Sequence, residues 1–418
     1  KCMNKKTENK AVSPWQWVPS LYFAQGIPYV VVMSVAVILF KRMGMSNTDI
    51  ALYTSGLNLP WVIKPLWSPL VDLLKTKRWW IVVMQILVGA GLAGIALTIQ
   101  GPLAFRYCLA FMWLLAFSSA THDIAADGFY MLGLNEKKQA YFVGIRNTFY
   151  RFAVIFGQGI LVMFAGWLEQ RYAREMPETA AIPQAWSLTF YLLTILFALL
   201  FVYHYLFLPH PRRDTCTLPP QQASAGRVFK EFLGTFTSFF QKKHIVSALI
   251  FILLYRFAEA QLVKITSPFL LDTPATGGLA LSTAEVGFIY GTIGVIALTI
   301  GGIVGGIAMA RRGLKSCLWT MTIAMNLPNI VYLYLSFARP ESIGIISGCV
   351  AIEQFGYGFG FTSLTYFMML FSNGKHQTAH YAICTGFMAL GLMLPGMISG
   401  WIEESIGYRA FFVWIMLC

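Results

Sequence analysis

Residues 79–99, WWIVVMQILVGAGLAGIALTI, decide the fold class, because none of these 21 residues is charged. As an α-helix the run would be about 30 Å long, which matches the hydrocarbon core of a bilayer. Apolar blocks of similar length, about a dozen in all, fill the rest of the chain. In lipid each backbone N–H and C=O must be satisfied within its own segment, so these blocks form helices. The sequence therefore predicts an all-α membrane protein.

The composition excludes other classes of protein. Of the 418 residues, 57% are hydrophobic and only 12% are charged, whereas a soluble domain carries about 25% charged residues. This excludes a disordered chain and argues against a soluble enzyme. One span with its connection takes roughly 30 to 35 residues, so the length accommodates about twelve spans. We expect them at residues 15–40, 48–71, 79–99, 103–133, 139–166, 185–208, 244–271, 282–309, 314–337, 342–371, 377–401 and from 408 onward.

The basic residues predict how the chain lies in the membrane. A net charge of +13 would suggest a nucleic-acid partner in a soluble protein, but basic loops orient membrane proteins. With the N-terminus inside, the inner segments hold 19 Lys and Arg residues and the outer loops hold 7. Cytoplasmic loops carry this excess. We therefore expect both termini in the cytoplasm, the bilayer as a partner and no nucleic-acid binding.

Several other chemistries have no support in the sequence. The seven cysteines are scattered without a CxxC pair or a Cys/His cluster, so neither a metal nor another cofactor is expected. A Walker motif, a paired catalytic His and a repeated channel filter are also missing from the sequence. An enzyme is therefore not expected, and a channel is less favoured. The sequence begins at Lys1 and stops at Cys418 inside an apolar run, from which we expect the natural chain to extend at both ends.

The sequence indicates that the chain consists of two related halves. A polar, proline-containing stretch at 209–243 interrupts the apolar blocks and predicts a cytoplasmic linker between residues 1–208 and 244–418. The motif Gly-Trp-x-Glu ends the fifth span at 166–169 and the eleventh span at 400–403. These observations predict two pseudo-symmetric halves of six helices each.

Two acids on the fourth span predict two acid–base pairs with the neighbouring fifth span. Asp123 and Asp127 are four residues apart, so they share one helical face. Counted from the turn before the fifth span, Asp127 matches the depth of Arg146, and Asp123 matches that of Arg151. Inserting a charged side chain at the centre of a span costs about 2.5 to 3.5 kcal/mol, so its presence indicates a structural or functional role. We expect proton coupling at the acids, substrate binding at Arg151, and a structural or gating role for Arg146. The alternative is that these acid–base pairs are charge-neutral contacts that hold the helices together and have no role in transport.

Further charges lie near mid-depth in other spans. Arg256 and Glu259 are three residues apart on the seventh span, Glu353 lies on the tenth, and Lys64 lies between two prolines on the second. Lys64 and Arg256 suit an anionic substrate, and the two glutamates suit a proton. The alternative is that these groups only form internal salt bridges. Lys264, nearer the outer end, is expected to extend toward the interface.

Two polar residues of the first span are further cavity candidates. Tyr22 and Gln25 immediately precede Gly26 and Pro28. We therefore expect Tyr22 and Gln25 to contact substrate.

Two loops resemble the signature of the major facilitator superfamily, Gly-x3-Asp-Arg-x-Gly-Arg-Arg. The first is SPLVDLLKTKR at 68–78 and the second is GIAMARRG at 306–313; both are degenerate. In that superfamily the halves are parallel repeats with the substrate between them near the midplane. The resemblance implies structural or gating roles for the matching residues Asp72, Arg78, Arg311 and Arg312.

Five segments narrow the resemblance to AmpG-type muropeptide permeases. Residues 23–28, FAQGIP, resemble the Gly-x-Pro segment of their first helix, and residues 64–72, KPLWSPLVD, resemble their Lys-x-Leu-Trp-Ser-Pro-x-x-Asp stretch. Residues 123–127, DIAAD, and the pair Tyr-Arg at 150–151 match patterns of the fourth and fifth spans. Residues 255–259, YRFAE, resemble a Tyr-Lys-x-x-Asp pattern with both charges kept in sign.

This resemblance implies a function and a location. AmpG-type members import anhydro-muropeptides, sugar–peptide fragments of the cell wall, from periplasm to cytoplasm with the proton gradient. We therefore expect a monomeric, multi-pass protein of a bacterial inner membrane whose partners are a small sugar–peptide substrate and protons. Relatives carry siderophores or acetyl-coenzyme A, and either class of anion would suit the same cations.

Overall fold

The computed structural model describes residues 13–211, 214, 233–234, 236–373 and 377–418, and within these ranges every regular element is helical. The first half of the chain contains α1 (Pro14–Val30), η1 (Val31–Val35), α2 (Ala36–Arg42), α3 (Asn47–Gly56), α4 (Leu59–Leu74), α5 (Lys77–Thr98), α6 (Ala104–Gly133), α7 (Glu136–Val154), η2 (Ile155–Ile160), α8 (Leu161–Tyr172) and α9 (Glu178–Phe207). The second contains α11 (Ile245–Leu254), α12 (Phe257–Leu271), α13 (Thr283–Phe288), η3 (Ile289–Gly294), α14 (Val295–Asn326), η4 (Leu327–Asn329), α15 (Ile330–Ala338), α16 (Ile343–Phe371) and α17 (Gln377–Leu417).

These helices confirm the all-α class and follow the predicted spans, with ends that differ by up to seven residues, as at Glu178, where α9 begins. The two longest, α14 and α17, each contain a break, at Gly313 (φ 73°) and Gly407 (φ 77°). Both glycines adopt a positive φ that other residues rarely take, so each break separates two predicted spans. Eight helical stretches of the described chain are long and apolar enough to cross a membrane. The segments of predicted spans two and ten fall outside these eight; span two is divided into α3 and α4, which have only 10 and 16 residues.

Polar caps fix where several helices begin. The side chains of Ser46, Thr76 and Asn135 each accept a hydrogen bond from the backbone N–H three residues later. Ser282 forms a reciprocal capping box with Glu285. Such caps satisfy backbone donors that a helix start leaves without a partner. Each cap therefore marks the end of a short loop and the start of the next span.

The helices depart from regular geometry at the middle of several spans. The segments η1, η2 and η3 are π-helical turns inside longer helices. Between α11 and α12 the helix is interrupted, and Arg256 adopts φ −109° and ψ 21°. Such interruptions often occur at functional sites. At this break Arg256 donates a hydrogen bond to Glu259, three residues later.

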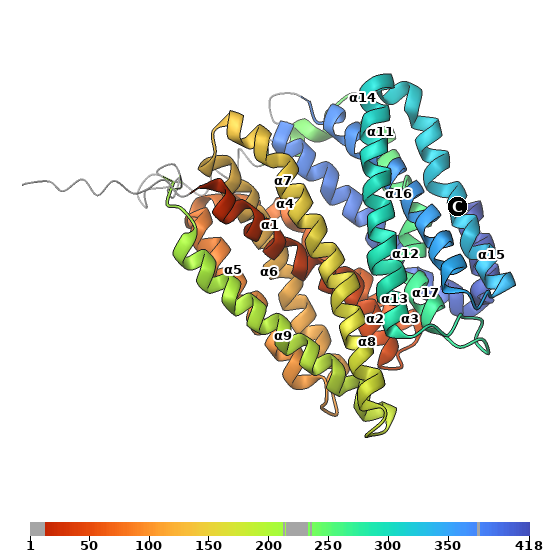
Figure 1. Ribbon diagram of the computed structural model, residues 1–418. Coiled ribbons are helices and arrows are strands. Elements are labelled where there is room, and N and C mark those ends of the chain that lie inside the picture. The colour runs from red at the N-terminus through yellow and green to blue at the C-terminus, as the bar shows by residue number, and fades with distance from the viewer. Residues whose placement is uncertain (1–12, 212–213, 215–232, 235, 374–376) are drawn as a thin grey trace, which may run out of the picture.

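The two halves of the chain lie on opposite sides of the bundle. In Figure 1, α5, α6 and α9 gather on one side, and α14, α15 and α16 gather on the other. The halves meet along two seams, in which α8 and η2 pack on α13 and η3, and α3 and α4 pack on α17. A Cβ atom at Gly291 would lie 2.0 Å from the carbonyl oxygen of Gln158, and one at Gly386 would lie 2.8 Å from that of Val62. Both seams therefore depend on glycine.

Two ends of the bundle are distinguished by their loops. We call the end with residues 75–76 and 134–135 the inner end, and the end with residues 43–46 and 272–282 the outer end. Which end faces the cytoplasm stays a prediction from the basic residues. Most of the predicted linker 209–243 lies outside the described residues, so the division into 1–208 and 244–418 also stays a prediction.

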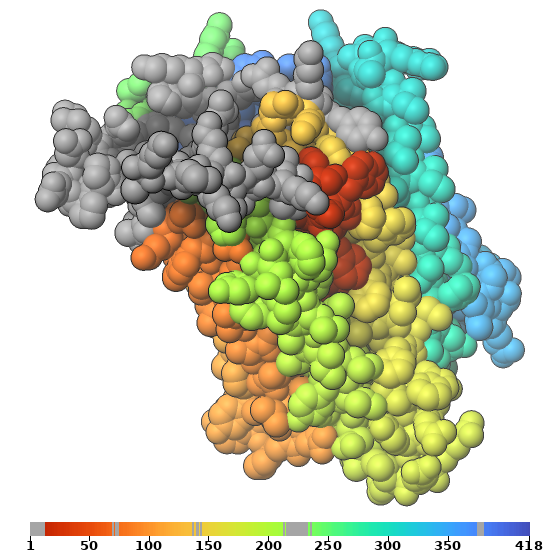
Figure 2. Space-filling model, turned by 60° about the vertical axis from the view of Figure 1, so that its left-hand side comes forward, coloured from red at the N-terminus to blue at the C-terminus, as the bar shows by residue number. Residues whose placement is uncertain are grey.

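The outer face of the bundle is apolar where the bilayer would surround it. Figure 2 shows one such face, with α9 in light green running down its front. Along α9, Leu192, Ile195 and Leu199 are exposed, while Phe190 and Phe197 are buried. Exposed apolar side chains at intervals of three to four residues form one continuous stripe. A stripe of this size needs a lipid or protein partner.

Candidate substrate and proton site

Asp123 joins three helices of the first half. Its carboxylate accepts a hydrogen bond from the amide of Gln25 on α1 and forms an ion pair with Lys64 on α4. The predicted pairing of Asp123 with Arg151 is therefore wrong. Depth along the membrane matched, but Lys64 extends from α4 and neutralises the acid first. The predicted partnership of Lys64 with a substrate anion remains a prediction.

Asp127 and Arg146 form the other predicted acid–base pair, and the structure confirms it. Arg146 Nη1 lies 3.3 Å from Asp127 Oδ1. Tyr22 bridges the pair, because its hydroxyl donates to Asp127 (3.0 Å) and accepts from Arg146 (3.1 Å). The guanidinium also lies over the rings of Tyr22 and Tyr130, 4.6 and 5.3 Å from their centroids. Such cation–π contacts add to the ion pair. Tyr22 therefore forms one hydrogen-bonded cluster with Asp127 and Arg146.

Close packing of α1 against α7 positions this first cluster. A Cβ atom at Gly26 would lie 2.6 Å from Ala153 Cβ. Only glycine permits this approach, which brings Tyr22 and Gln25 toward the acids on α6. Tyr22 and Gln25 are buried, and their predicted contact with substrate stays a prediction. Their contacts are with Asp127 and Asp123.

Arg256 and Glu259 form a buried ion pair in the second half. Arg256 Nε and Nη2 lie 3.0 and 2.8 Å from Glu259 Oε2, and both residues are buried. Arg256 Nη2 also donates to the hydroxyl of Tyr357, at 2.6 Å. The guanidinium lies 5.2 and 5.0 Å from the ring centroids of Tyr357 and Phe361. The expected shared face of Arg256 and Glu259 is confirmed, although a helix break, rather than regular spacing, brings them together.

Glu353 is an acid of a different kind. It is 2% exposed, and its Oε2 accepts hydrogen bonds from Tyr332 (3.1 Å) and Gln354 (2.9 Å). Among the described residues it has no cationic partner within ion-pair distance. Lys64 is not its partner, because Lys64 forms an internal ion pair with Asp123, as the alternative of internal salt bridges expects. Glu353 can gain or lose a proton without breaking an ion pair.

Lys264 does not extend to the interface as expected. It is only 2% exposed and has neither a hydrogen bond nor an ion pair with any described residue. Neighbours on α12 such as Leu262 and Ile265 belong to the large apolar core. The side chain is too far inside the bundle to reach water or headgroups. A buried cation without a partner is costly.

Arg151 is the cation most available for a ligand. It is half-buried and has no hydrogen-bond or ion-pair partner among the described residues. Tyr150 precedes it on α7, and the ring of Tyr29 on α1 lies 6.4 Å from that of Tyr150. Sequence reasoning noticed Tyr150 as part of the Tyr-Arg pair but missed Tyr29, because aromatic residues are also common in the lipid interface.

The residues predicted to act at the gating loops are only partly described. Arg78 donates to the backbone carbonyls of Leu208 (3.3 Å) and Tyr205, and its own N–H donates to Asp214 (3.0 Å). It therefore ties the start of α5 to the end of α9. The side chain of Asp72 lies outside the described side chains. Arg311 and Arg312 are exposed, and neither has a hydrogen-bond or ion-pair partner in the described part of the chain.

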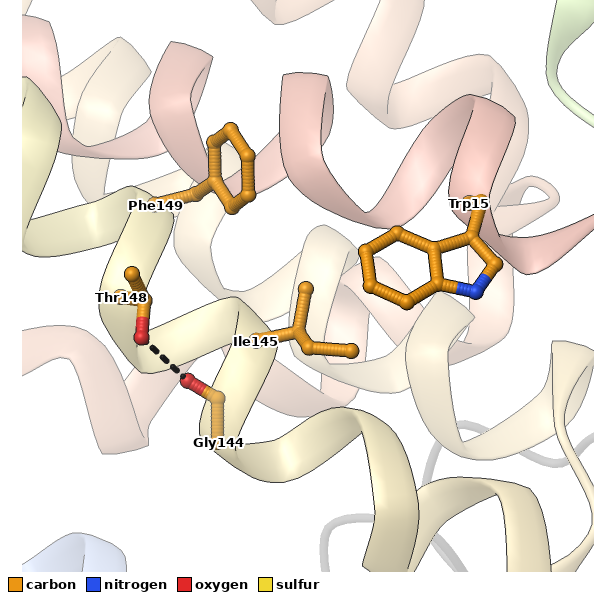
Figure 3. A pocket seen from close by; sticks show the side chains of 5 residues that line it. All are labelled: Trp15, Gly144, Ile145, Thr148 and Phe149. Carbon is orange, nitrogen blue, oxygen red and sulfur yellow. Dashed lines mark hydrogen bonds between the residues drawn. The ribbon is translucent and has the colours of Figure 1, made fainter.

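A separate hollow lies between the start of α1 and the middle of α7. It has a volume of about 450 Å³ and is lined by Trp15, Gly144, Ile145, Thr148 and Phe149. Figure 3 shows the apolar side chains of Trp15 and Ile145 facing one another across it, while Thr148 Oγ1 donates to the carbonyl of Gly144 at 2.9 Å. None of these lining residues is ionisable. The hollow is therefore not the charged site.

Metal binding has no candidate in the described ranges. Within them, no group of three His, Cys, Asp or Glu side chains is close enough to hold an ion.

Comparison with known proteins shows a matching protein family and similar relatives. The family model described as "Major Facilitator Superfamily" matches residues 20–373. The "Putative transporter AmpG 4" of Rickettsia conorii is 25% identical over 408 residues, covering 95% of this chain and 92% of that protein. The "Anhydromuropeptide permease" of Escherichia coli is 24% identical over 400 residues, covering 94% of this chain and 75% of that protein.

Solved structures share the arrangement of helices. The nucleoside transporter NupG matches with a TM-score of 0.69 at 15% identity, over 96% of this chain and 95% of that one. A D-xylose–proton symporter matches with a TM-score of 0.66 at 13% identity, over 96% and 94%. Likeness at such low identity is informative about the fold alone.

Proposed function

Because this chain belongs to the major facilitator superfamily of membrane transporters and is not an enzyme, we propose that it imports anhydro-muropeptides together with protons. Its similarity to the Escherichia coli anhydromuropeptide permease over 94% of the chain supports this class of substrate. The proposed direction is from periplasm to cytoplasm across a bacterial inner membrane, by a monomer with both termini in the cytoplasm. The excess of basic residues in the predicted inner segments supports that orientation.

One observation carries the proposal: each half of the bundle contains a cation paired with an acid inside its helices. Lys64 pairs with Asp123 in the first half, and Arg256 pairs with Glu259 in the second. A muropeptide bears carboxylates, amides and hydroxyl groups. Arginine binds a carboxylate through two parallel hydrogen bonds, so Arg151 and Arg256 are the proposed contacts for its acidic groups.

Lys64 and the acids take complementary roles in this proposal. Lys64 and Gln25 already bind Asp123, so an incoming substrate carboxylate would compete with Asp123 for the ammonium group. Such an exchange links substrate binding to the state of Asp123. Asp127 and Glu259 have arginine partners of their own.

Glu353 is the acid best suited to carry the proton. Its hydrogen bonds come from neutral donors, so protonation does not separate two charges. A carboxyl group that alternates between the neutral and ionised forms needs this freedom. We therefore assign proton coupling first to Glu353, with Asp123, Asp127 and Glu259 as the acids whose ion pairs respond to the substrate.

Uptake by competition tests the substrate class. Membrane vesicles that contain the protein are given labelled anhydro-muropeptide together with an excess of unlabelled muropeptide, a ferric siderophore or acetyl-coenzyme A. We expect only the muropeptide to compete. Competition by the siderophore or by acetyl-coenzyme A alone would assign the chain to the corresponding alternative. Vesicles carrying Arg151→Gln provide a matched variant with reduced competition.

A further inference from the structure

Three aromatic residues from different helices of the first half lie side by side. The ring of Tyr29 on α1 lies 5.3 Å from that of Trp61 on α4, at an angle of 84°. The same tyrosine lies 6.4 Å from Tyr150 on α7, at 46°. All three side chains are half-buried. They therefore present ring surface, rather than packing completely into the core.

Their polar groups have no partner within the described protein. The hydroxyl groups of Tyr29 and Tyr150 make no hydrogen bond to any described residue, and neither oxygen is sealed from solvent. Arg151, next to Tyr150, is also without a hydrogen-bond or ion-pair partner there. Polar groups at mid-depth in a membrane protein are costly unless something satisfies them. Two phenols and one guanidinium around an aromatic surface match a ligand with both apolar and polar faces.

We propose that Tyr29, Trp61 and Tyr150, with Arg151, form a saccharide subsite that binds the sugar ring of the substrate. A pyranose ring has apolar C–H faces, which pack on aromatic rings, and equatorial hydroxyl groups, which bond to phenols. Arg151 then binds an acidic or carbonyl group beside that ring. The inference rests on the proposed function and adds which part of the muropeptide the first half recognises.

Binding of three probes to the purified full-length protein tests this subsite. The probes are the anhydro-disaccharide–peptide, the same disaccharide without the peptide, and the same peptide without the sugar. We expect Trp61→Leu and Tyr29→Leu to weaken disaccharide binding about tenfold, and to leave binding of the sugar-free peptide unchanged. Trp61→Phe should restore most of the affinity. The matched control is Trp319→Leu, since Trp319 is 76% exposed on α14.

The outcomes separate the subsite from the wider function. Unchanged disaccharide affinity in Trp61→Leu and Tyr29→Leu, with normal binding by the wild type, overturns the subsite alone. A wild-type protein that binds none of the three probes overturns the proposed function and the subsite with it.

The repeated Gly-Trp-x-Glu motif supports a second, independent inference. Both copies lie at the outer end, on helices of different halves. A Cβ atom at Gly166 on α8 would lie 2.3 Å from the backbone nitrogen of Ala284 on α13. One at Gly400 on α17 would lie 2.0 Å from the carbonyl oxygen of Asn47 on α3. Each glycine therefore lets a helix of one half touch the first turn of a helix in the other.

The glutamates of the motif make matching contacts. Glu169 Oε2 accepts a hydrogen bond from Thr283 Oγ1 at 2.7 Å, and Glu403 Oε2 accepts one from Asn47 Nδ2 at 2.6 Å. Thr283 and Asn47 are the first residues of α13 and α3. Both glutamates are buried, 5% and 4% exposed. An acid at the N-terminus of a helix is also favoured by the helix dipole.

Neighbouring charges strengthen both contacts. Arg42 Nε lies 3.1 Å from Glu169, and Trp186 Nε1 donates to the same carboxylate at 2.7 Å. In the other copy, Lys41 joins the halves through Asp272 of the second half at 2.7 Å. Lys41 and Arg42 both end α2, so this helix serves both contacts.

We infer that the two motif copies form an outer clasp, defined by Gly166 and Glu169 with Thr283, and by Gly400 and Glu403 with Asn47. The clasp holds the outer ends of the two halves together, and both copies must release before this end opens. Because each copy joins helices of opposite halves, the repeat is preserved in function as well as in sequence.

Accessibility from the outer side tests the clasp without any substrate. In a background without native cysteines, Ser55→Cys serves as the reporter, since Ser55 is fully buried between α3 and α17 beneath the clasp. We expect little labelling by an impermeant maleimide in the otherwise unchanged protein, and several-fold more with Gly166→Ala or Gly400→Ala. Gly306→Ala is the matched control, because a Cβ at Gly306 meets no atom within 4 Å.

A milder variant distinguishes loss of the clasp from misfolding of the protein. Glu403→Gln keeps the side-chain volume, so raised labelling with unchanged elution on size exclusion supports the clasp. Labelling that stays at the reference level in both glycine variants and in Glu403→Gln overturns it.

Discussion

Replacing Arg256 with Met should destabilise the protein far more than replacing Arg146 with Met. The Arg256–Glu259 pair is buried, with side chains 9% and 6% exposed, so the lost partner leaves a charge that water cannot solvate. Removing one member of such a pair typically costs about 3 to 5 kcal/mol. The Arg146–Asp127 pair has side chains 27% and 38% exposed, and exposed pairs contribute about 1 kcal/mol or less.

Two double-mutant cycles measure this difference. One cycle combines Arg256→Met with Glu259→Gln, and the other combines Arg146→Met with Asp127→Asn. The free energy of unfolding of the purified protein is followed by denaturant titration in detergent. We expect the first double variant to recover much of the loss caused by Arg256→Met, because the unpaired acid is then neutral. Equal coupling energies in the two cycles, or a stable Arg256→Met single variant, would refute the reasoning from burial.

Three further outcomes follow from the same structure. Glu353→Gln should abolish accumulation driven by a proton gradient and leave counterflow exchange intact; accumulation that persists would remove Glu353 from coupling. Gly26→Ala should lower the midpoint of thermal unfolding, since the new Cβ would lie 2.6 Å from Ala153 Cβ, while Gly144→Ala, with open space around it, should not; equal midpoints would contradict the close packing. Lys264→Met should raise the midpoint, because a buried cation without a described partner is removed, and a lower midpoint would show that the ammonium group is stabilised.

Much of the fold is predictable because one physical requirement dominates it. Apolar runs such as residues 79–99 must be helical in lipid, and the predicted ends differ from those of the observed helices by up to seven residues. Glycine at 313 and 407 breaks long helices at the predicted boundaries, since both positions need a positive φ.

The candidate site was less predictable, because sequence gives depth but not the rotation of one helix against another. Asp127 found Arg146 as expected, whereas Asp123 pairs with Lys64 from α4 instead of Arg151. Lys264 shows the same difficulty: its depth suggested an exposed end, but its direction buries it.

The aromatic residues were missed for a different reason. Tyr29 and Trp61 resemble the many aromatic side chains that face lipid, and only the contact between their rings distinguishes them. The repeated Gly-Trp-x-Glu motif, in contrast, was visible as a repeat, but its contacts with Thr283 and Asn47 needed the structure.

Accumulation of labelled anhydro-muropeptide in right-side-out vesicles, with an inward proton gradient imposed by lowering the external pH, tests the central claim most directly. The account predicts that wild-type vesicles concentrate the label above its external level, and that a protonophore abolishes this accumulation. Vesicles that take up no label, or that take up equal amounts with and without the gradient, would contradict proton-coupled muropeptide import.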